Sequence, residues 1–86
     1  MSKLTKAEKK WLDDVQEVLR KCPSTRIAFY TIGGNSIRAY DNTKYAEICD
    51  HLDKSRAGDF GHSVEAVDAC FNAELWFPQP IESTAG

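Results

Sequence analysis

The side chains best suited to metal binding or nucleophilic chemistry are Cys49, His51, His62 and Cys70, which combine the thiolate and imidazole groups that zinc prefers. Structural zinc sites usually supply their ligands as close pairs, about two to four residues apart, whereas most of these four stand alone in the sequence. Cys49 and Cys70 also lie on predicted apolar stripes, where a free cysteine behaves as a small hydrophobic residue. The pattern therefore favours core packing over a metal site.

Catalysis by a cysteine and a histidine has no better support. No cysteine lies at the start of a predicted helix, where the helix dipole would activate a thiol. The carboxylates of the first predicted helix have the spacing of solvent-exposed, ion-pairing groups: Glu8, Asp13, Asp14 and Glu17. We therefore expect a protein that is not an enzyme and that uses neither a metal nor another cofactor.

The composition indicates a folded protein with balanced charge. Hydrophobic residues make up 42% of the 86-residue chain, and 11 basic residues against 13 acidic residues give a formal charge of −2. This balance does not favour a nucleic acid or a membrane as the partner. No apolar run is long enough to cross a bilayer, and the N-terminus lacks the apolar core of a signal peptide. With three cysteines that form no close pair, we expect a cytoplasmic protein.

The first helix is predicted from Thr5 to about Lys21. Thr5 and Glu8 have the spacing of a capping box, and Pro23 ends the helical pattern. Apolar residues recur between these limits at helical spacing, which predicts an amphipathic helix. We expect its apolar stripe to be buried in the core, with these members: Trp11, Val15, Val18 and Leu19.

A β-hairpin is predicted for residues 26–32 and 36–40, because both segments are rich in β-branched and aromatic residues and residues 33–35 are Gly-Gly-Asn. A loop of two or four residues would place Phe29 opposite Tyr40 and Thr31 opposite Arg38 on one face of the hairpin. A three-residue loop would shift the register by one residue. The register therefore stays open at this point.

The rest of the chain predicts two more helices and a strand. Residues 41–43 offer N-caps for a helix whose stripe contains Tyr45, Ile48, Cys49 and Leu52. Ser63 is expected to cap a short third helix, and residues 73–77 read as a final strand. The order α-β-β-α-α-β predicts an α+β fold in which helices pack on one face of a small antiparallel sheet. Residues 1–80 would form this domain and residues 81–86 a flexible tail.

The hairpin face opposite the helices is the predicted partner-binding site, with Phe29, Thr31, Arg38 and Tyr40 as its residues. Exposed aromatic residues beside an arginine are typical of protein interfaces. Alternatively, a longer loop or the C-terminal tail folds over these rings. A different class of function, nucleic-acid binding, would use lysines on one side of the first helix: Lys3, Lys6 and Lys10.

Three segments resemble small uncharacterised accessory proteins of lambdoid phages and prophages of enteric bacteria: LTKAEKKWLDDVQEVLRKCPS, RIAFYTIGGNSIRAYD and the terminal STAG. The resemblance implies a protein that acts inside a bacterial cell by binding and modulating a host protein, and we expect the effect to be inhibition. It carries no catalytic or binding residues over to this chain. A second copy of the chain could also serve as the partner.

Overall fold

The computed structural model describes residues 2–54 and 58–82. Within them the chain forms an α+β fold in the predicted order α-β-β-α-α-β, and the three strands form one antiparallel sheet with β2 in the centre. The elements are α1 (Lys6–Arg20), β1 (Ile27–Tyr30), β2 (Ser36–Asp41), the short 3₁₀ helix η1 (Asn42–Lys44), α2 (Tyr45–Lys54), α3 (Phe60–Ala66) and β3 (Cys70–Trp76).

Local sequence signals determine both ends of α1. The Thr5 hydroxyl accepts a hydrogen bond from the Glu8 backbone N–H at 3.1 Å, and the Glu8 carboxylate accepts one from the Thr5 N–H at 2.8 Å. This is the predicted capping box, which satisfies two N–H groups that a helix start leaves without partners. The helix ends at Arg20, three residues before Pro23, so both predicted boundaries are confirmed.

The hairpin register differs by one residue from the arrangement that would pair Phe29 with Tyr40. Phe29 lies opposite Ala39, Tyr30 opposite Arg38 and Ala28 opposite Tyr40. The loop comprises residues 31–35, in which Gly33 and Gly34 have φ values of 97° and 74°, a region that favours glycine. Since neighbouring residues of a strand point to opposite faces, this shift places Phe29 and Tyr40 on different sides of the sheet.

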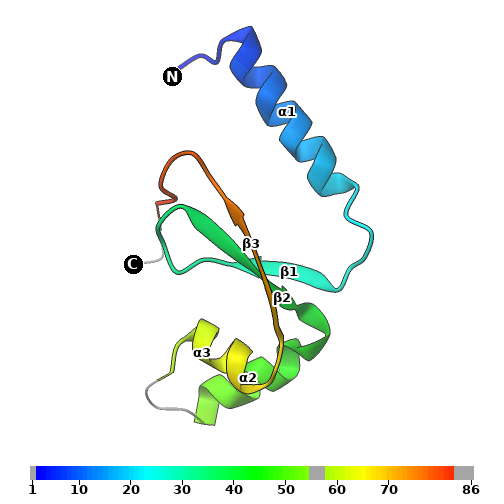
Figure 1. Ribbon diagram of the computed structural model, residues 1–86, viewed down its shortest axis with the longest axis vertical. Coiled ribbons are helices and arrows are strands. Elements are labelled where there is room, and N and C mark those ends of the chain that lie inside the picture. The colour runs from blue at the N-terminus through cyan, green and yellow to red at the C-terminus, as the bar shows by residue number, and fades with distance from the viewer. Residues whose placement is uncertain (1, 55–57, 83–86) are drawn as a thin grey trace.

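An aromatic cluster fastens α2 and α3 to one face of the sheet. The rings of Tyr30, Tyr40 and Phe60 meet with centroids 5.2 to 6.0 Å apart, in tilted or edge-to-face geometry. Ile48 of α2 and Val64 of α3 are fully buried beside Tyr40. Both helices lie below the sheet in Figure 1. The core therefore occupies the space between these helices and one face of the sheet.

The C-terminal elements begin earlier than the sequence predicts. Asp59, not Ser63, caps α3, since its carboxylate accepts the His62 backbone N–H at 2.8 Å. Ser63 is buried inside α3, and its hydroxyl is 2.8 Å from Nδ1 of His51. Strand β3 starts at Cys70 and contains an irregularity around Asn72, whose φ is 55°.

The chain after β3 remains attached to the hairpin for several residues. The Phe77 N–H donates to the Asn35 carbonyl and the Ile81 N–H donates to the Gly34 carbonyl, each at 2.7 Å. Ile81 is also half-buried. The attachment thus extends into the first residue of the predicted tail, while residues 83–86 lie outside the described residues.

Helix α1 stands apart from the rest of the molecule, which corrects the prediction that its stripe is buried. None of its residues is buried, and Figure 1 shows the helix projecting away from the sheet. The radius of gyration is 15.6 Å, whereas a compact chain of this length has about 12 Å. Amphipathic spacing correctly predicted the helix and its apolar side, but none of the residues that the structure describes covers that side.

This arrangement predicts very different effects on stability for two substitutions that each place a carboxylate at an apolar helix position. Val18→Asp should change the free energy of unfolding of the monomer by no more than about 0.5 kcal/mol, because 70% of Val18 is exposed. Its thermal unfolding temperature should therefore stay almost unchanged. Ile48→Asp should prevent folding, because Ile48 is fully buried. Circular dichroism melts at low micromolar concentration measure both; a Val18→Asp protein that fails to fold would contradict the exposed position of α1.

Candidate functional site

The face of the sheet opposite α2 and α3 is apolar, and no helix within residues 2–54 and 58–82 packs over it. Strand alternation and the observed register assign its side chains, which we call the open face: Ile27, Phe29, Ile37, Ala39, Phe71, Ala73 and Leu75. Phe29 and Leu75 are 40% and 44% exposed. Ala39 is buried beneath its neighbours and helps to line a groove of about 350 Å³ between Phe29 and Phe71.

Charged groups near this groove lie at its edge and neutralise one another. The Arg26 guanidinium lies 3.3 Å from the Asp41 carboxylate and 4.8 Å from the centroid of the Phe71 ring. Asp41 also accepts hydrogen bonds from the hydroxyl and the backbone N–H of Thr43. The Thr43 hydroxyl, followed by its N–H and by Arg26, lowers the pKa of Asp41 below its ordinary value of 3.8. The groove itself is left to apolar contacts.

A second apolar surface runs along α1. We call it the α1 stripe: Trp11, Leu12, Val15, Val18 and Leu19. Trp11 is 53% exposed and Val18 70% exposed, and only Val15 is as much as half-buried. On the polar side, Lys9 pairs with Asp13 at 3.2 Å and Lys10 with Asp14 at 3.0 Å. The helix therefore has one solvated side and one side that is poorly suited to water.

The four residues predicted to bind a partner do not share one surface. Phe29 belongs to the open face, whereas Tyr40 is only 6% exposed and lies in the core. Arg38 is on the same side of the sheet as Tyr40 and pairs with Glu74 at 3.8 Å. The Thr31 hydroxyl shapes the hairpin loop, since it accepts the Gly33 N–H and donates to the Ser36 carbonyl. Only Phe29 remains in a candidate binding surface.

The lysines of the nucleic-acid alternative do not form a separate basic patch. Lys3 precedes the N-cap of α1, and Lys6 opens the helix. Lys10 is paired with Asp14, and the neighbouring Lys9 is paired with Asp13. Acidic groups thus interrupt the surface on which phosphates would have to bind.

The cysteines and histidines are brought together only in part. The rings of His51 and His62 lie with centroids 5.5 Å apart, and His51 is held by Ser63. Among residues 2–54 and 58–82, no group of three or more His, Cys, Asp or Glu side chains is arranged to hold a metal ion. Cys70 packs against the core, and Cys49 is half-buried beside Tyr45, whose pKa is raised by the hydrogen bond to the Cys49 side chain.

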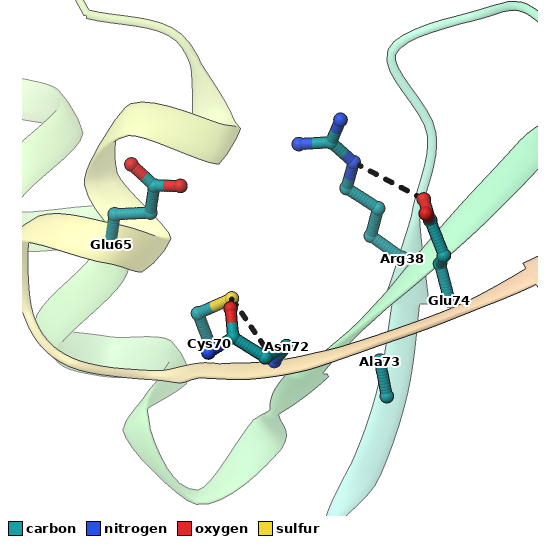
Figure 2. Close-up of a pocket in the computed structure, with 6 residues that line it drawn as sticks. All are labelled: Arg38, Glu65, Cys70, Asn72, Ala73 and Glu74. Carbon is teal, nitrogen blue, oxygen red and sulfur yellow. Dashed lines mark hydrogen bonds and ion pairs between the residues drawn. The ribbon is translucent and has the colours of Figure 1, made fainter.

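A small polar hollow lies on the helix-covered side of the sheet, where Figure 2 shows Arg38 directed toward Glu74 and the Cys70 thiol beside Asn72. Its volume is about 190 Å³, below the roughly 300 Å³ at which small-molecule sites begin. The Cys70 sulfur accepts the Asn72 N–H at 3.3 Å and its thiol faces the Asn72 side-chain oxygen at 3.7 Å. These bonds stabilise the irregular part of β3, so the hollow has a structural explanation.

Comparison with known proteins identifies no relative: no protein-family model matches the chain, and neither the curated proteins nor the solved structures give a significant match. In the part of the chain that the structure describes, no helix combines the length and the apolarity required to span a membrane. The α1 stripe and the open face therefore remain the principal candidate functional surfaces.

The position of Tyr40 predicts a structural defect for Tyr40→Ala. Removing this ring opens a cavity beside Ile48 and Val64 and should lower the free energy of unfolding by about 3 kcal/mol. Phe29→Ala, on the open face, should cost much less because its ring is already 40% exposed. Urea unfolding followed by circular dichroism compares the two; equal losses would contradict the assignment of Tyr40 to the core.

The environment of Asp41 predicts a contribution to stability that depends on acidic pH. Because the pKa of Asp41 is lower in the folded state than its ordinary value of 3.8, this contribution is present above about pH 4 and is lost as the pH falls through the lowered pKa. Thr43→Val removes the hydroxyl and should raise the pKa of Asp41 toward 3.8. A carboxyl titration by NMR measures the change; an unaltered titration in Thr43→Val would show that the hydroxyl has no such effect.

Proposed function

We propose that this chain is a non-enzymatic accessory protein that binds a host protein by inserting the α1 stripe into an apolar groove of that partner, and that it thereby modulates, in the direction of inhibition, the partner's activity. The observation that carries the proposal is the exposure of the α1 stripe, with Trp11 at 53% and Val18 at 70%.

The spacing of the stripe matches a known mode of peptide recognition. An amphipathic helix that docks into a groove uses anchors at positions i, i+3 or i+4, and i+7. Trp11, Val15 and Val18 stand at i, i+4 and i+7, and Leu12 and Leu19 widen the stripe on one side. Trp and other large side chains at the centre of such a contact supply most of the binding energy.

The remaining features of α1 agree with a helix that is formed before binding. Its capping box and its paired charges stabilise the helix without help from the sheet. A preformed helix loses less conformational entropy on binding than a disordered segment does. The resemblance to phage accessory proteins supports a bacterial host protein as the partner.

The proposal predicts that one position on the stripe controls binding. The immobilised protein should retain a specific host protein from an enteric bacterial lysate, identified by mass spectrometry, and Val18→Asp should weaken that interaction about thirtyfold or more, as loss of a buried anchor costs about 2 kcal/mol. Gln16→Asp is the matched control, because it adds the same charge to the same helix at an exposed position that is already polar, at the edge of the stripe beside Leu12 and Leu19; it should bind far more tightly than Val18→Asp.

Three outcomes would count against the proposal. The capture of no specific protein, or equal capture by Val18→Asp, would remove the role of the α1 stripe. Retention of nucleic acid that is lost in high salt and on charge reversal of Lys6 and Lys10 would replace the proposal with the nucleic-acid alternative.

A further inference from the structure

We infer that the open face binds the α1 stripe of a second copy of this chain, so that two copies exchange their first helices in a symmetric dimer, here called the exchanged dimer. The inference rests in part on the proposed function, because both treat the α1 stripe as a binding surface. It starts from the presence, in one chain, of two apolar surfaces of different shape that do not touch each other.

The chain exposes more surface than a compact monomer of its mass, and the excess is large enough for a dimer interface. The accessible surface is 7069 Å² for a mass of 9.7 kDa, whereas a compact monomer of that mass exposes about 5,100 Å². The excess is roughly 2,000 Å² in each chain, whereas a stable protein interface of standard size buries only about 800 Å² on each partner. Two reciprocal contacts of α1 with the open face can therefore supply an interface of standard size.

The dimensions of the two surfaces agree. Helix α1 has 15 residues and is thus about 22 Å long and about 10 Å wide. The central strand β2 has 6 residues, which gives about 20 Å, and the outer strands of a three-stranded sheet lie about 10 Å apart. One helix of this size covers one face of such a sheet. Both surfaces lack charge at their centres, since the charges of α1 and of the groove edge are already paired.

The connection between α1 and β1 indicates that the helix covering the open face comes from a second copy and not from the same chain. Residues 21–26 contain Pro23 and a set of local hydrogen bonds: the Cys22 N–H to the Leu19 carbonyl, the Cys22 thiol to the Ser24 carbonyl and the Arg26 N–H to the Ser24 hydroxyl. Arg26 is further held by Asp41 and Phe71. Folding α1 back onto its own sheet would break several of these contacts. Exchange between two copies leaves them intact, and short, constrained connections are those that promote such exchange.

The exchanged dimer would cover the surface that the proposed host partner needs. Dimer and host complex therefore exclude each other, and the protein binds its host partner as a monomer. The open face has no role in host binding under this arrangement, so substitutions there separate the two events.

The experiment measures the molar mass of the full chain by light scattering over a range of concentrations. Wild type should approach twice the 9.7 kDa chain mass as the concentration rises. Val18→Asp on the stripe and Phe29→Asp on the open face should each remain monomeric and folded by circular dichroism. An equimolar mixture of the two variants should recover dimer, because one of the two reciprocal contacts is then formed by an intact stripe and an intact open face. Gln16→Asp, at the already polar edge of the stripe, should retain most of the dimer.

A second open-face variant keeps the test decisive if Phe29→Asp does not fold. Ala73→Asp adds the charge at an exposed position of β3 that lines the groove, and it should also prevent dimerisation. Asn72→Asp is its matched control on the preceding residue, which lines the hollow but not the groove and has a backbone conformation that aspartate tolerates. It should dimerise like wild type.

Contacts between chains identify the geometry directly. In a mixture of isotope-labelled and unlabelled chains, NMR should detect intermolecular contacts from Trp11 and Val18 to Phe29 and Phe71. A mass of one chain at all concentrations up to about 1 mM overturns the inference, as does a dimer that survives both open-face substitutions. Either result leaves the proposed function standing if host capture still depends on Val18. If the wild-type protein forms the dimer but captures no host protein, the proposed function alone is overturned.

Discussion

The contact among the rings of Tyr30, Tyr40 and Phe60 determines how the rest of the molecule is arranged. These rings join the hairpin to the start of α3, and Ile48 and Val64 complete the core around them. Because the cluster takes one face of a three-stranded sheet, it decides which face stays without a helix. The open face is thus a direct consequence of where three aromatic side chains meet.

Local signals in the sequence predicted most of the elements, since their causes lie within a few residues of one another. The capping box at Thr5 and Glu8 and the stop before Pro23 defined α1, and the Gly33-Gly34 pair marked the hairpin loop. The class and the order of elements were confirmed for the same reason. The predicted start of α3 was wrong because Asp59, and not Ser63, is its N-cap. Both residue types are good N-caps, and sequence spacing does not show which of the two caps the helix.

The candidate site was harder to predict because it depends on register and on long-range packing. A shift of one residue in the hairpin placed Phe29 and Tyr40 on opposite faces of the sheet, and the length of a glycine-containing loop is not fixed by its composition. The amphipathic pattern of α1 showed which residues avoid water. It does not show whether the apolar surface that covers them belongs to the same chain, so the pattern alone predicts that the stripe around Val18 lies in the core, whereas Val18 is exposed.

Both tryptophans of the chain lie in solvent, Trp11 at 53% and Trp76 at 71% exposure. Indole emission shifts to shorter wavelength when the ring leaves water, so the fluorescence of this protein reports poorly on the packing of its core. Trp11 belongs to the α1 stripe, whereas Trp76 ends β3 opposite Ser36, on the side of the sheet opposite the open face. The intrinsic emission is therefore a built-in optical probe: a partial blue shift follows the covering of α1, with the second indole as an internal reference.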